Sequence, residues 1–119
     1  MKHKILVIAL QDIIIDHKKV AERIDNACHF PISMAVTGIL YHSEKLYLTL
    51  EHTKDTQIYK YVIATISSLN SDEITAELSS RAFYGFSFIG GFEFNNKFMG
   101  LFKFKPEIID HNEDKYSLQ

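Results

Sequence analysis

The fold class is decided by one stretch of the chain, Met34-Ala35-Val36-Thr37-Gly38-Ile39-Leu40-Tyr41-His42-Ser43-Glu44-Lys45-Leu46-Tyr47-Leu48-Thr49-Leu50-Glu51. Residues 34–41 and 45–51 are rich in aliphatic, β-branched and aromatic side chains, which predicts two strands. Only three residues, 42–44, separate these strands, and so short a link joins antiparallel neighbours. An antiparallel hairpin is therefore expected here.

Two elements are expected before this hairpin. Residues 5–10 form a continuous aliphatic run, which is typical of a strand covered on both faces at the centre of a sheet. From Asp16 a polar start leads into apolar side chains at helical spacing, and the residue before Pro31 is biased away from the α conformation. A helix between Asp16 and Pro31 is therefore predicted.

Two more elements are expected after the hairpin. Residues 58–69 carry apolar side chains at successive spacings of 3, 1, 3, 1 and 3, which predicts an amphipathic helix with Thr53 as its N-cap. Residues 73–79 alternate between apolar and polar side chains, which predicts a half-exposed strand. The order strand, helix, strand, strand, helix, strand is that of the ferredoxin-like α+β fold, with both helices on one face of the sheet.

The C-terminal third differs in composition. Residues 83–104 hold eight of the nine phenylalanines and four of the five glycines, which predicts at least one further strand and a turn at Asn95-Asn96. An aromatic hairpin of this kind would expose an apolar face too large for an ordinary monomer, unless the polar tail folds back over it. We therefore expect an interaction surface formed by Phe92, Phe94, Phe98, Phe102 and Phe104. The chain is expected to form one domain spanning 1–105, followed by a polar tail at 106–119.

Composition and motifs exclude several classes of function. Thirteen basic residues against fifteen acidic ones give no electrostatic footprint for nucleic acid. The single Cys28 allows no internal disulfide and fits a buried, inert thiol, and the six histidines show no metal-ligand spacing. No nucleophile elbow or acid–base pair is found, and no membrane span or export signal. We expect a cytoplasmic protein that is not an enzyme and holds no metal.

Two motifs resemble one family. Val36-Thr37-Gly38-Ile39-Leu40-Tyr41 and Leu46-Tyr47-Leu48-Thr49-Leu50-Glu51 resemble a strand pair of the BLUF domains, which are flavin-dependent blue-light sensors. Arg81-Ala82-Phe83-Tyr84-Gly85-Phe86-Ser87-Phe88 resembles the Arg-x-Phe-x-x-Trp-Ser-Met motif that opens their last strand. The resemblance covers about residues 1–94. It implies a flavin cleft between the two helices. Independently of the resemblance, Arg81 begins the aromatic stretch and could pair with Glu51 or Glu77, face an anionic ligand or lie in solvent.

The residues that BLUF photochemistry needs are replaced. Carried over from the resemblance, the family's tyrosine falls near Val7, its asparagine near Pro31 and its glutamine at Leu48, while Phe86 and Phe88 would form apolar walls. None of the first three can serve the light-driven hydrogen-bond switch. The resemblance therefore implies a BLUF-like regulatory module without a photocycle or cofactor, acting through a protein partner or as a homo-oligomer. The alternative is a sensor that still holds FMN, FAD or another planar ligand between the helices.

Overall fold

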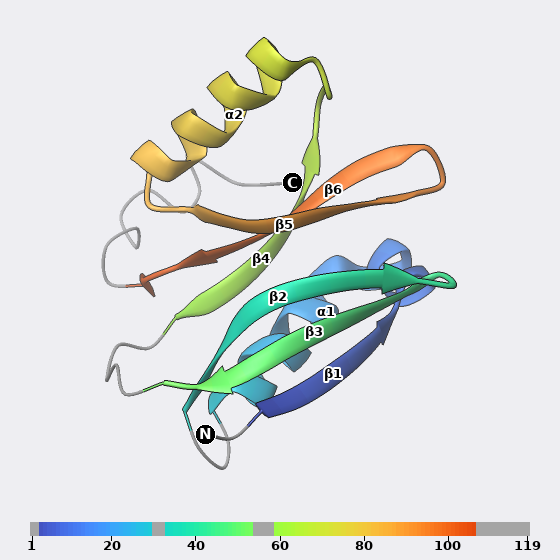
Figure 1. Ribbon diagram of the computed structural model, residues 1–119, viewed down its shortest axis with the longest axis vertical. Coiled ribbons are helices and arrows are strands. Elements are labelled where there is room, and N and C mark those ends of the chain that lie inside the picture. The colour runs from blue at the N-terminus through green and yellow to red at the C-terminus, as the bar shows by residue number, and fades with distance from the viewer. Residues whose placement is uncertain (1–2, 30–32, 54–58, 107–119) are drawn as a thin grey trace.

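The computed structural model describes residues 3–29, 33–53 and 59–106. The elements are β1 (His3–Ala9), α1 (Leu10–His29), β2 (Met34–His42), β3 (Lys45–His52), β4 (Lys60–Ile66), α2 (Ser71–Phe83), β5 (Ser87–Phe94) and β6 (Lys97–Phe104). The chain has an α+β fold with two antiparallel three-stranded sheets, ordered β1-β3-β2 and β4-β6-β5 (Figure 1).

The two sheets repeat one topology. Each half of the chain runs strand, helix, strand, strand, and each places its last strand at the centre of its sheet. Both hairpins close with two residues at positive φ, Ser43-Glu44 in the first and Asn95-Asn96 in the second. Both also carry a bulge at the same place, before Gly38 and before Gly90. The fold is thus a duplicated βαββ unit, a feature that sequence inspection did not reveal.

Several expected elements are confirmed. The hairpin of β2 and β3 forms where predicted, and the aromatic hairpin of β5 and β6 turns at Asn95-Asn96. The helix α1 begins earlier than expected, at Leu10, and kinks at Asp16, where φ is −159°. The Asp16 carboxylate accepts a hydrogen bond from the Lys19 amide at 3.1 Å, so it caps a second helical segment at the expected start.

Two expected elements are wrong. Residues 58–69 were expected as a helix, but the described part of this range contains β4, and residues 73–79 lie in α2, where a strand was expected. The strand β4 is covered on both sides, with Tyr61 and Ile63 in one core and Ala64 in another. Because both faces of the strand are apolar, its apolar residues do not alternate with polar ones, and their spacing resembles that of a helix. The helix α2 is fixed by its N-cap, since the Asn70 side chain accepts hydrogen bonds from the amides of Asp72 and Glu73. The ferredoxin-like order is therefore not confirmed.

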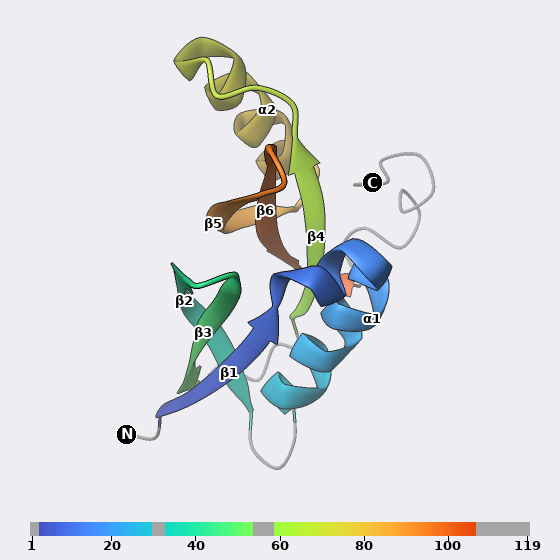
Figure 2. The same cartoon turned by 90° about the vertical axis from the view of Figure 1, so that its right-hand side faces the viewer.

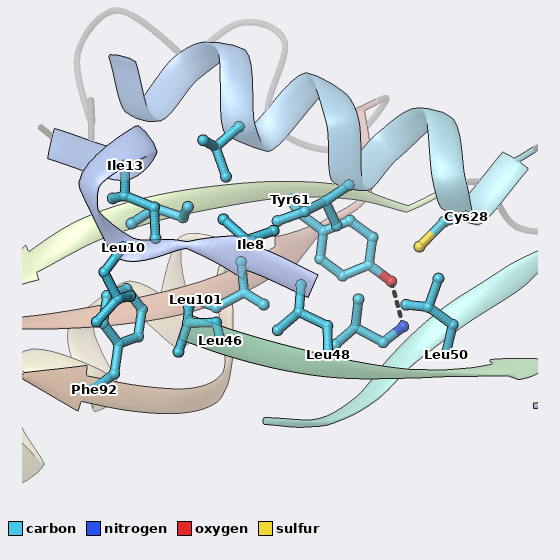
Figure 3. Close-up of a cluster of buried hydrophobic side chains, with 14 of the residues drawn as sticks. Ile8, Leu10, Ile13, Cys28, Leu46, Leu48, Leu50, Tyr61, Phe92 and Leu101 are labelled. Atoms are coloured by element: carbon cyan, nitrogen blue, oxygen red, sulfur yellow. Dashed lines mark hydrogen bonds between the residues drawn. The ribbon is translucent and has the colours of Figure 1, made fainter. Parts of the chain in front are cut away.

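The interior consists of two clusters of unequal size. The large core lies between α1, the first sheet and one face of the second sheet, and Figure 3 shows Leu46, Leu48 and Leu50 pointing into it. A smaller cluster around Ala64, Phe86 and Phe102 lies on the other side of the second sheet, where Leu78 of α2 packs. Figure 2 shows α1 beside the first sheet and β4, and α2 at the far end of the molecule. The helices therefore do not enclose a common cleft.

Candidate functional site

The candidate site is the face of the first sheet that points away from α1. Side chains alternate along β3, so Leu46, Leu48 and Leu50 are buried at 0–2% exposure, whereas Tyr47 and Thr49 point to the opposite side. Antiparallel register then aligns neighbours on the same face. We define the outer face by two central rows and two end rows across β1, β3 and β2: Val7-Tyr47-Leu40, Ile5-Thr49-Gly38, Ala9-Lys45-His42 and His3-Glu51-Ala35.

The centre of the outer face is apolar and open to solvent. Leu40 is 64% exposed, Ile5 55% and Val7 42%, and they lie on three strands with Tyr47 between them. The end rows are polar, and His3 Nδ1 lies 3.5 Å from Glu51 Oε1. An apolar centre with a charged rim is the usual anatomy of a protein-binding surface.

The duplicated fold shows that this exposure is unusual. In the second sheet the positions equivalent to the two central rows include Ile63, Leu101 and Phe92, which are 2%, 1% and 8% exposed. They belong to the large core, and β4 packs directly against α1. In the first sheet, by contrast, Figures 1 and 2 show no described element over the outer face. Much of this surface is therefore buried within the chain in the second sheet, whereas the described residues leave its counterpart in the first sheet uncovered.

Sequence reasoning missed this face because it placed residues 5–10 at the centre of a sheet. The strand β1 is instead an edge strand, and only Leu6 and Ile8 of its alternating side chains pack against the core. A continuous apolar run predicts cover on both sides. Here one side of the run packs on the core, and the other side forms an apolar surface that no described residue covers.

The expected cleft positions are not brought together. Leu48 is fully buried in the large core, and Val7 lies on the opposite face of the same sheet. Phe86 is buried in the smaller cluster, Phe88 is 41% exposed on the second sheet, and Pro31 lies outside the described residues. The geometry therefore gives no support to a planar ligand held between the two helices.

The expected aromatic surface is also not formed as predicted. Phe92 and Phe102 are buried, and Phe94, Phe98 and Phe104 are half-buried. The reason is that the second sheet is covered on both faces, by the large core on one side and by α2 on the other. Phe83, at the end of α2, is instead the most exposed large apolar side chain among those described, at 82%.

Arg81 takes one of the roles that the sequence left open. Its guanidinium pairs with Glu77 Oε2 at 2.8 Å, donates to the Thr65 carbonyl oxygen at 3.2 Å and lies 5.0 Å from the centre of the Phe102 ring. It does not contact Glu51 in this arrangement. Arg81 thus fastens α2 to β4 and β6, which is a structural task.

Two hollows occur elsewhere on the surface. One of about 410 Å³ lies along the exposed side of α1 near Asp16, and another of about 500 Å³ lies between the tips of the two hairpins, beside Tyr41 and Glu93. Neither lies between α1 and α2. Within residues 3–29, 33–53 and 59–106 no three potential metal-ligating side chains gather, and no helix there is long and apolar enough to span a membrane.

A buried polar cluster joins α1 to β4 inside the large core. The Tyr61 hydroxyl accepts a hydrogen bond from the Val36 amide at 3.0 Å, as Figure 3 shows, and Cys28 lies beside it. Burial raises the pKa of Cys28 to about 11 and also raises the pKa of Tyr61. Cys28 is therefore protonated at neutral pH and is a poor nucleophile.

The same cluster predicts a pH-dependent stability. The Asp25 carboxylate accepts a hydrogen bond from the Tyr61 amide at 2.9 Å, and burial raises the pKa of Asp25 from 3.8 to about 6. The folded chain thus holds the Asp25 proton more tightly than the unfolded chain does. The resulting contribution to the stability of the fold is fully present below about pH 4 and is lost as the pH rises through 6.

Asp25→Asn keeps an acceptor for the Tyr61 amide but removes the charge. Because the carboxylate is only partly buried, we expect the variant to be more stable than the parent by about 1–2 kcal/mol at pH 7.5, and equally stable at pH 4. Urea unfolding at both pH values measures this difference. The exposed Glu93→Gln serves as the control, and a stability difference for Asp25→Asn that does not change with pH would contradict the expectation.

The likeness to BLUF domains rests on the strand motifs alone and stays a prediction. The described fold does not reproduce the cleft on which that resemblance depends. No family model, no curated protein and no solved structure matches this chain.

Proposed function

We propose that this chain is a non-catalytic interaction module that binds a protein on its outer face. The observation that carries the proposal is the exposed apolar centre formed by Ile5, Val7, Leu40 and Tyr47 on three adjacent strands. Exposed apolar surface of this extent, rimmed by charged side chains, is stabilised when a partner removes it from water.

The shape of the face favours a protein over a small ligand. Small molecules bind in concave sites that bury most of their surface. The outer face is an open sheet surface three strands wide, and its charged residues, among them Lys45 and Glu51, lie at its ends. Leu48, at the position of the family's glutamine, has no amide and lies in the core, so in this proposal the module works without a BLUF photocycle.

Site-specific photo-crosslinking tests the proposal. Benzoylphenylalanine in place of Tyr47 puts the reactive group at the centre of the outer face, whereas the same residue in place of Ile15 puts it on another exposed apolar site, 73% exposed on α1. We expect a discrete crosslinked protein, identified by mass spectrometry, from position 47 and none from position 15. The irradiation is done in cells that express the chain. No adduct at position 47, or equal amounts of adduct at positions 47 and 15, would contradict the proposal.

A further inference from the structure

The outer face is complementary to itself. Along β3, the central strand, its residues are Lys45, Tyr47, Thr49 and Glu51, so a positive charge stands at one end and a negative charge at the other. Turning a second copy end for end brings each charge opposite its counterpart. Leu48 lies midway between Lys45 and Glu51 along β3, so the rotation that brings each of these charges opposite the other is centred over Leu48.

We propose that the partner on the outer face is a second copy of this chain, packed face to face about a two-fold axis that crosses β3 over Leu48. The proposal rests on the interaction function proposed above. In this dimer Lys45 faces Glu51 of the other copy twice, and each β1 lies over the other β1. The contact between His3 and Glu51 stays at the rim, where both side chains remain part of the polar edge.

The sizes of the side chains fit the same arrangement. The axis sets the row Val7-Tyr47-Leu40 of one copy against the row Ile5-Thr49-Gly38 of the other. Tyr47 then faces the smaller Thr49, and Leu40 faces the space above Gly38, which has no side chain. A large residue against a small one lets two sheets interdigitate at the roughly 10 Å spacing of packed sheets.

The size of the face sets the expected affinity. From strand geometry it measures roughly 23 Å along the strands and about 14 Å across them, or about 320 Å² per copy, which is less than half of the roughly 800 Å² per partner of a standard interface. Packed sheets cross at about 30°, an offset that the long side chains of Lys45 and Glu51 span at the ends of β3. We expect a weak, reversible dimer with a dissociation constant on the order of 10 µM.

Sedimentation equilibrium with charge-swapped variants tests this register. The full chain is measured from 1 to 300 µM, alone and as Lys45→Glu, as Glu51→Lys, as an equimolar mixture of these two variants, and as the double variant. Each single variant places two like-charged pairs in the dimer, and we expect it to weaken association about tenfold or more. The mixture and the double variant restore two opposite-charge pairs, so both are expected to dimerise like the parent chain.

The control and the outcomes separate this inference from the proposed function. Lys18→Glu, exposed on α1, should leave the dissociation constant unchanged, and circular dichroism checks that every variant folds. A parent chain that stays monomeric at 300 µM, or a mixture that fails to recover association, overturns the second copy as partner. In that case a crosslink from position 47 to a different protein would still uphold the interaction function, whereas no crosslink at all would remove both.

Discussion

Replacing Leu48 with glutamine is expected to lower the free energy of unfolding by about 3–5 kcal/mol. The substitution removes a fully buried aliphatic side chain and puts an amide among the aliphatic side chains of the large core, such as Ile8, Leu46 and Leu50. Leu48 also occupies the position of the glutamine in the BLUF resemblance. A site built for a flavin would accept this side chain, and a packed core would not.

Chemical denaturation monitored by circular dichroism measures the effect of Leu48→Gln. Ile15→Gln makes nearly the same chemical change at a position that is 73% exposed, and it should alter stability by less than about 0.5 kcal/mol. A Leu48→Gln variant as stable as the parent would show that a cavity able to solvate an amide lies beside β3. The hydrophobic account of the large core would then be incorrect.

Phe102→Ala is the second large effect we expect, at about 3–5 kcal/mol, because it removes the centre of the smaller cluster. Phe102 is fully buried, its ring lies 5.5 Å from that of Phe88, and Arg81 stacks over it. No residue of α2 is fully buried, and its partly buried Leu78 packs on this cluster, so the attachment of the helix depends largely on the cluster. The loss of stability should therefore affect mainly the packing of α2 on the second sheet.

Hydrogen exchange locates the effect of Phe102→Ala. Amides of α2 are expected to exchange faster by two or more orders of magnitude, whereas exchange of the β3 amides should be accelerated much less. Phe83→Ala, at an aromatic residue 82% exposed on α2 itself, is the matched control and should change little. Equal acceleration in β3 and α2 would contradict a separate role for the smaller cluster.

The sequence was most informative where local signals and tertiary packing agree. The first hairpin was predictable because its two strands are separated by a link that allows little else, and Asn95-Asn96 fits the left-handed turn residues of a tight hairpin. The start of the regular part of α1 at Asp16 was readable from its capping side chain. In these elements a few neighbouring residues determine the backbone.

The assignments failed where burial on two sides decides the structure. In β4, Tyr61 and Ala64 are both buried but belong to different cores, so periodicity alone suggested a helix. In α2, the Asn70 cap outweighs an alternation that resembled a strand. The outer face was missed for a related reason, since Ile5 and Val7 look like core residues until the edge position of β1 is known.

The packing of α1 against β4 ties the two halves of the chain together. The helix belongs to the first βαββ unit and the strand to the second, yet Asp25 of one bonds the Tyr61 amide of the other, and both contribute to a single large core. Neither unit can therefore complete its interior alone. A polypeptide severed between β3 and β4 would regain its shape through fragment complementation, with each piece acting as the template on which the other assembles.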